Sequence, residues 1–80
     1  MDSNQTILIG YKSLISVEFT DNGLKCHFRN HMTGESFSYV FPPEHLKIDD
    51  ISDWVFRSNI QDAMPNLTAT EREWFLSGTR

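Results

Sequence analysis

The sequence predicts an α+β fold in which an antiparallel sheet comes first and short helices follow. Apolar and polar residues alternate between Leu14 and Phe41, and from Ile48 onward the apolar residues recur about every 3.6 positions. Two turn signals, Asn22-Gly23 and Thr33-Gly34, divide the alternating part into three strands. We therefore expect a three-stranded antiparallel meander with two or three short C-terminal helices packed on one face.

Ahead of these strands, Ile7-Leu8-Ile9 is a short apolar run that Gly10 ends. Two placements stay open for this run: an extra N-terminal edge strand, or a segment packed across an open end of the core. The chain, residues 1–80, is short enough for one small domain. We expect its β part over about residues 6–41 and its helical part over about residues 48–78.

A two-residue loop at Asn22-Gly23 sets the register of the first hairpin. It pairs Phe19 with Cys26, and two residues further from the loop a second pair of residues lies directly opposite each other. That second pair is Val17 with Phe28. Because residues directly opposite each other share a face, these four side chains form one apolar face, and the residues between them form a polar face.

A two-residue loop at Thr33-Gly34 continues the apolar face onto a third strand. It pairs Phe28 with Tyr39, and the residues two positions on either side of Tyr39 are also aromatic. A slip by one residue would turn these aromatics into water, so burial selects the register. A four- or five-residue loop around residues 31–35 is the alternative to this tight turn.

The helical part follows Pro42-Pro43, which ends the third strand because proline cannot donate a ladder hydrogen bond. Ile51, Trp54 and Val55 have the spacing of an apolar helix stripe. Asp49-Asp50 stands where an N-cap and first-turn carboxylates stabilise the start of a helix. This predicts a first helix that begins near these aspartates.

The apolar stripe loses its phase at Arg57-Ser58-Asn59, and a second stripe consists of Phe56, Ile60, Ala63 and Met64. We therefore expect two short helices with a kink between them, and Pro65 ends the second. Thr68 and Glu71 have the spacing of a capping box for a last helix. That helix carries Trp74, Phe75 and Leu67 inward and ends at Gly78.

Composition and charge narrow the class of protein. The chain is 39% hydrophobic and 22% charged, which indicates a folded protein, and a net charge of −4 does not favour nucleic acid. The single cysteine, Cys26, falls on the core face and has no intramolecular partner, which favours a reducing compartment. The N-terminus lacks a basic start followed by an apolar run, and no stretch approaches the ~20 apolar residues of a membrane span. We expect a soluble cytoplasmic protein.

No constellation of residues predicts catalysis, a metal site or a cofactor. Cys26 and His27 are neighbours on a strand, so they face opposite ways and cannot bind one metal ion. No serine, threonine or cysteine lies in a recognisable nucleophile motif. We therefore expect a protein that is not an enzyme and has no metal or cofactor.

The helical region offers the leading candidate surface for a protein partner. Its aromatic and arginine side chains are of the kinds that dominate protein interfaces. Its acidic residues could meet a basic partner, although helix capping alone also explains them, and a place in the core also explains Trp54. The candidate residues are Trp54, Phe56, Arg57, Trp74, Asp49, Asp50 and Asp53.

Two alternative functions use other parts of the chain. Lys25, His27 and Arg29 lie on the predicted polar face and could contact nucleic acid, although that face lacks aromatic residues on which bases stack. On this surface His27 could instead pair across the strands with Glu18. A small virion or assembly component would associate with itself, for which a homodimer is the simplest form.

The C-terminal third contains the segments Ile60–Thr68, Glu71–Phe75 and Ser77-Gly78, and in these it resembles the ending of a group of small bacteriophage and mobile-element proteins without an established activity. The shared pattern is Ile-Gln-x-Ala-x-Pro-x-Leu-Thr/Ser, then Arg-Glu, then a helix that ends in Gly. In this chain the likeness covers residues 53–78. The resemblance implies a phage-encoded protein in the host cell cytoplasm. The expected function is therefore a protein-binding module that inhibits or modulates a host or viral protein.

Overall fold

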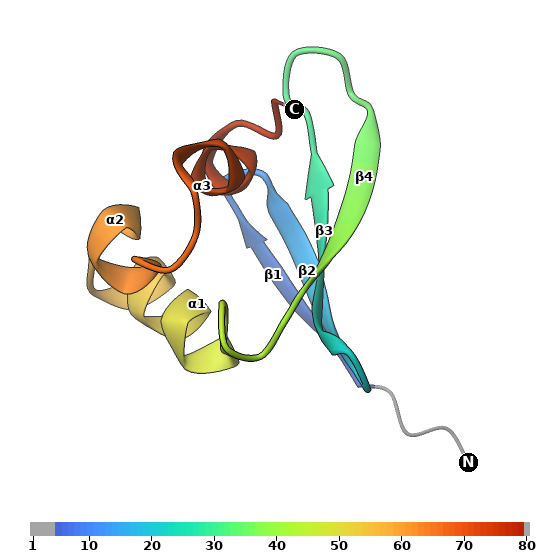
Figure 1. Ribbon diagram of the computed structural model, residues 1–80. Helices are drawn as coiled ribbons and strands as arrows, with labels where there is room; N and C mark the ends of the chain where they lie inside the picture. The colour runs from blue at the N-terminus through green and yellow to red at the C-terminus, as the bar shows by residue number, and fades with distance from the viewer. Residues whose placement is uncertain (1–4, 80) are drawn as a thin grey trace.

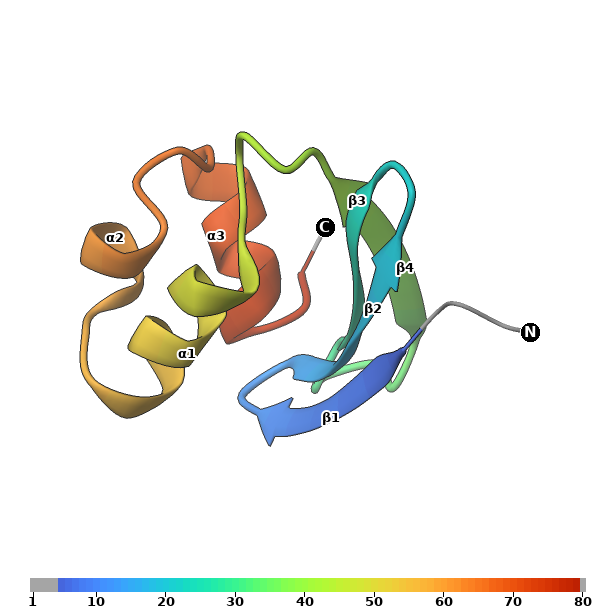
Figure 2. The ribbon, with the colours of Figure 1, turned by 90° about the horizontal axis from the view of Figure 1, so that it is seen from below.

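The computed structural model describes residues 5–79 and arranges them in two layers. One layer is a single antiparallel sheet with the strand order β1-β2-β3-β4, and three helices cover one of its faces (Figures 1 and 2). This confirms the α+β class, the antiparallel sheet and the helices that follow it. The elements are β1 Thr6–Tyr11, β2 Leu14–Thr20, β3 Gly23–Arg29, β4 Ser36–Phe41, α1 Ile48–Phe56, α2 Ile60–Ala63 and α3 Ala69–Leu76.

The sheet has four strands, so the prediction of three is wrong by one. The extra strand is β1, which pairs antiparallel with β2 and lies at the edge of the sheet. The run Ile7-Leu8-Ile9 thus takes the first of its two open placements. The turn into β2 contains Lys12 with a φ of 54°, a conformation that non-glycine residues seldom adopt. The turn consists of Lys12-Ser13, so this hairpin lacks the Asn-Gly or Asp-Gly pair by which a two-residue turn is recognised in a sequence.

The first predicted turn is displaced by one residue. The loop consists of Asp21-Asn22, because Thr20 pairs with Gly23. The predicted pairs Phe19–Cys26 and Val17–Phe28 are therefore wrong: from Ser16 to Thr20, each β2 residue faces the β3 residue two positions before its predicted partner. A shift of two residues keeps every side chain on its face, so the predicted apolar face is present despite the error.

Gly23 belongs to β3 for a reason that the turn pattern does not supply. Its φ is 142°, and a Cβ atom at this position would overlap the carbonyl oxygen of Phe41 on β4. The backbones of β3 and β4 thus approach too closely for any side chain. The preceding turn is held by Thr20, whose hydroxyl donates to the Gly23 carbonyl at 2.8 Å and accepts from the Asn22 N–H at 3.2 Å.

The second hairpin uses the longer loop that was the alternative to a two-residue turn. The Asn30 N–H donates to the Glu35 carbonyl at 2.8 Å, and the Asn30 side chain accepts from the Met32 N–H at 2.8 Å. These bonds form an Asx-type loop in place of the predicted turn at Thr33-Gly34. The predicted pair Phe28–Tyr39 is therefore wrong, and Tyr39 faces Cys26. This shift is again two residues, and the aromatic face is kept.

The core lies between the inner face of the sheet and the helices, and Phe75 of α3 is at its centre. The ring of Phe75 is 4.8 Å from that of Phe28 and 5.6 Å from that of Trp54, measured between centroids. Burial of Ile51, Phe75 and Leu67 confirms the predicted inward stripes, but Phe56 of the second stripe is 79% exposed, because it belongs to the end of α1 and not to α2. The buried apolar residues are Leu14, Val17, Leu24, Cys26, Phe28, Phe41, Leu46, Ile51, Trp54, Ala63, Met64, Leu67 and Phe75.

The helix boundaries follow the sequence closely, with one correction at the first. Helix α1 begins at Ile48 with Lys47 in the N-cap position, so Asp49 lies in the first turn and is not the cap. A carboxylate oxygen of Asp50 accepts from the Lys47 N–H at 3.1 Å, which satisfies a free donor at the helix start. The predicted break after α1 and the predicted capping box of α3 are both confirmed.

The end of α3 is fixed against the sheet. Gly78 has a φ of 76°, and its N–H donates to the Trp74 carbonyl at 3.0 Å, as in a glycine-terminated helix. A Cβ atom here would collide with the carbonyl oxygen of Arg29 at the end of β3. Among residues 5–79, no helix is long and apolar enough to cross a membrane.

Candidate functional site

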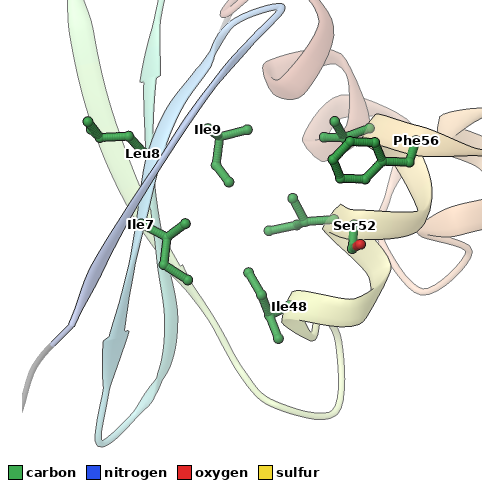
Figure 3. Close-up of a pocket in the computed structure, with 8 residues that line it drawn as sticks. Ile7, Leu8, Ile9, Ile48, Ser52 and Phe56 are labelled. Carbon is green, nitrogen blue, oxygen red and sulfur yellow. The ribbon is translucent and has the colours of Figure 1, made fainter.

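An apolar hollow of about 290 Å³ lies between the edge strand β1 and helix α1. Figure 3 shows Ile7 and Ile9 turned toward α1, while Leu8 points to the opposite face of the sheet. The alternation of a strand explains this, because successive side chains point to opposite faces. We call this hollow the β1–α1 groove, and its lining residues are Ile7, Leu8, Ile9, Ile48, Ile51, Ser52, Val55 and Phe56.

Phe56 is the most prominent side chain of the β1–α1 groove. It is the last residue of α1, it is 79% exposed, and Figure 3 shows its ring on the groove side of the helix. Arg57 follows it as the exposed C-cap residue, and the Arg57 N–H donates to the Asp53 carbonyl at 2.8 Å. Two of the predicted partner-binding residues thus stand side by side at one end of the groove.

The acidic candidates separate into two kinds. Asp49 and Asp53 are exposed and lie one helical turn apart on α1, next to Ser52 and Phe56 on the helix surface. Asp50 is half-buried and engaged with the Lys47 N–H. Asp49 and Asp53 therefore expose their side chains on α1 beside the groove-lining residues Ser52 and Phe56, whereas Asp50 serves the helix start.

Trp54 is buried in the core, with 5% of its surface exposed. Its ring lies 4.9 Å from that of Tyr11 and 5.6 Å from that of Phe75, in both cases edge to face. A partner cannot reach it without opening the core. Trp54 therefore lies in the core, which was the alternative to a surface position for this residue.

Trp74 lies on the other side of the helical layer, away from the β1–α1 groove. Its ring is half-buried and contacts the aromatic residues of β4, at 5.7 Å from Phe37 and 5.1 Å from Tyr39. Its indole Nε1 is buried without a hydrogen-bond partner. The structure therefore does not bring Trp54, Phe56, Arg57 and Trp74 together into one accessible patch.

The cysteine and histidine candidates for chemistry are dispersed. Cys26 is fully buried on the inner face, and this burial raises the pKa of its thiol far above the usual range. His27 lies on the outer face, where its Nε2 is 3.5 Å from a carboxylate oxygen of Glu18. Within residues 5–79, no group of three or more His, Cys, Asp or Glu side chains is placed to hold a metal ion.

The outer face of the sheet carries the alternative nucleic-acid residues. Lys25 and His27 are half-buried and Arg29 is exposed on β3. The aromatic side chains of the described strands belong to the inner face, where they pack on the core. The outer face thus lacks a stacking platform for bases within the described strands.

Sequence reasoning missed the β1 half of the groove. The signal was present in Ile7 and Ile9, which alternate correctly for a strand with one covered face. Their role depends on the hairpin with β2, which the unusual turn at Lys12 conceals. The α1 half, including Phe56 and Arg57, was predictable from the end of the helical stripe.

Comparison with known proteins identified no relative of this chain. No protein-family model matches the sequence, and neither a curated protein nor a solved structure is significantly similar to the chain.

Proposed function

We propose that the protein is a small non-enzymatic protein-binding module that inhibits or modulates a larger host or viral protein by covering part of its surface. The observation that carries this proposal is the exposed ring of Phe56 beside the β1–α1 groove. Apolar surface of this kind is unfavourable in water, and a partner that covers it removes that cost. The resemblance of residues 53–78 to phage and mobile-element proteins supports a phage-encoded module in the host cytoplasm.

The residue types around the β1–α1 groove support protein recognition. Aromatic and arginine side chains dominate the binding energy of protein interfaces, and Phe56 and Arg57 are adjacent here. The exposed carboxylates of Asp49 and Asp53 flank them along α1. Such charges at the rim of an interface orient a partner and favour one with basic side chains.

The lining of the groove supports binding over catalysis. A hollow of about 290 Å³ accommodates a few apolar side chains of a partner. Among its lining residues only Ser52 carries a polar side chain, so acid–base pairs are absent from this lining. The groove therefore favours an apolar contact over a chemical step.

The experiment is affinity capture from bacterial lysate with three forms of the protein. We expect the wild-type chain and the Met32→Ala variant to retain the same partner, and the Phe56→Ala variant to lose it by at least about tenfold. Met32 is the matched control because it is an exposed apolar residue in the loop between β3 and β4, at the far end of the molecule from α1 (Figure 1). Equal retention of a partner by all three forms would contradict this site.

Nucleic-acid binding is the alternative, and the same preparations separate it from protein binding. It predicts salt-sensitive retention on a DNA or RNA column that Lys25→Gln and Arg29→Gln weaken and Phe56→Ala leaves unchanged. Retention of that kind, without capture of a protein partner, would replace the proposal.

A further inference from the structure

The edge strand β1 presents unused backbone groups on its outer side. The Phe19 N–H donates to the Gln5 carbonyl at 3.0 Å, and Ile7 pairs with Val17 two residues further along. In an antiparallel ladder, alternate residues bond to one neighbour and the residues between them point their N–H and C=O groups the other way. Thr6 and Leu8 therefore direct their backbone groups away from β2, toward the open edge of the sheet.

This edge lacks the usual protection against strand pairing. Proteins commonly guard an edge strand with a lysine, a proline or an inward-pointing charge. Thr6–Tyr11 contains none of these. Its side chains are instead apolar and accessible: Leu8 is 82% exposed and Ile7 is 39% exposed. The shift in register between Leu8 and Tyr11, where Gly10 has a φ of 62°, is a form of edge protection, but it lies beyond the segment Thr6–Leu8.

We propose that β1 pairs antiparallel with β1 of a second copy of the chain, so that two sheets join into one across a twofold axis. Thr6 of each copy exchanges backbone hydrogen bonds with Leu8 of the other, using the groups that point to the open edge. Ile7 then lies opposite Ile7 of the second copy on the inner face, at the mouth of the β1–α1 groove.

A second copy fits this edge better than an unrelated chain for two reasons. Twofold symmetry makes the donors and acceptors complementary automatically, since each copy supplies the same two residues in the opposite direction. The net charge of the chain is −4, which would oppose self-association through most surfaces. The strand Thr6–Tyr11 carries no charge, so the two copies meet without like charges in the ladder.

The opposite edge of the sheet is a poorer pairing site. The outer face of β4 carries Ser36, Ser38 and Val40, and Val40 is 36% exposed, whereas Leu8 on the outer face of β1 is 82% exposed. The inner side of β4 is already contacted by Trp74. Pairing through β4 would therefore bury less apolar surface than pairing through β1.

The first test measures mass by sedimentation velocity over about 10 μM to 1 mM, where the dissociation constant of a small interface falls. We expect the wild-type mass to rise toward twice that of the monomer, Leu8→Lys to stay monomeric, and Ser38→Lys to behave as wild type. Ser38 is the matched control at the middle of the other edge strand. A wild-type chain that stays monomeric at the highest concentration, or a dimer that survives Leu8→Lys, overturns the proposal.

Amide exchange on the wild-type chain provides a second test that needs no variant. We expect the Thr6 and Leu8 amides to exchange at least about tenfold more slowly at high than at low protein concentration. The Ile7 amide faces β2 and serves as the internal control. Association without slower exchange at Thr6 and Leu8 would assign the dimer to another surface.

The dimer and the proposed binding of a partner can be tested independently of each other. A wild-type chain that captures its partner but stays monomeric at the highest concentration would contradict the dimer alone. Phe56→Ala should abolish capture and leave the dimer.

Discussion

The two edges of the sheet are completed in different ways. At β4, the inner side chains Phe37 and Tyr39 both contact the ring of Trp74, which reaches across from α3. At β1, Ile7 and Ile9 face α1 across an apolar hollow of about 290 Å³. One edge is thus packed by a single large aromatic side chain, and the other is left partly open.

The difference arises from where the two tryptophans lie. Trp74 is directed at β4, whereas Trp54 packs on Tyr11 at the end of β1 and on Phe75 in the centre. The smaller side chains of Ile48 and Val55 are left to face the middle of β1. Surface available for recognition is therefore concentrated at the edge that lacks an aromatic cover.

The largest loss of stability is expected from removing Phe75, whose side chain lies at the centre of the core. Phe75→Ala deletes a fully buried ring that packs between Phe28 and Trp54, so we expect a loss of about 3–5 kcal/mol in the free energy of unfolding. Urea unfolding followed by circular dichroism measures it. A loss below about 1 kcal/mol would show that the two edges are held independently.

A smaller effect is expected when only the β4 edge is opened. Trp74→Ala removes a half-buried ring and its contacts with Phe37 and Tyr39, so we expect a loss of about 2–3 kcal/mol. Phe56→Ala on the other side is the matched control and should change stability by less than about 0.5 kcal/mol. Equal losses for the two variants would contradict the contrast between the edges.

The smallest effect is expected from closing the β1 edge. Ser52→Leu adds an apolar side chain to the groove, and we expect a gain of about 0.5–1 kcal/mol in the free energy of unfolding, measured by thermal or urea unfolding. The same variant should weaken partner capture, because the groove is then filled. A loss of stability would show that the groove is too narrow for the added side chain.

Much of the fold was predictable because its signals are periodic. Alternation by two assigns Val17, Cys26 and Phe28 to the core correctly, even though both hairpin registers were predicted wrongly. The errors were each two residues, and a strand repeats its faces every two residues, so the hydrophobic pattern could not detect them. The exact pairs depend on Gly23, whose role is close packing against Phe41 and not a turn.

The candidate site was predictable only in part, because half of it depends on a tertiary contact. Phe56 and Arg57 could be recognised from their place at the end of a helical stripe. Trp54 is also an aromatic residue of the same helix, and only its packing on Tyr11 and Phe75 shows that it is not on the surface. The contribution of β1 required a hairpin whose turn residue, Lys12, adopts an uncommon backbone conformation.

The contact of Gly78 with Arg29 bears on the order of assembly. The four strands follow one another along the chain, so each hairpin closes a short loop and can form early. Gly78 meets the end of β3 only after nearly fifty intervening residues have been placed, and the Ser13 N–H reaches the Phe75 carbonyl of the same helix, at 3.0 Å, across a longer stretch still. We therefore expect docking of α3 to complete folding of this domain, and a nascent chain to hold its aromatic face uncovered until α3 has been synthesised.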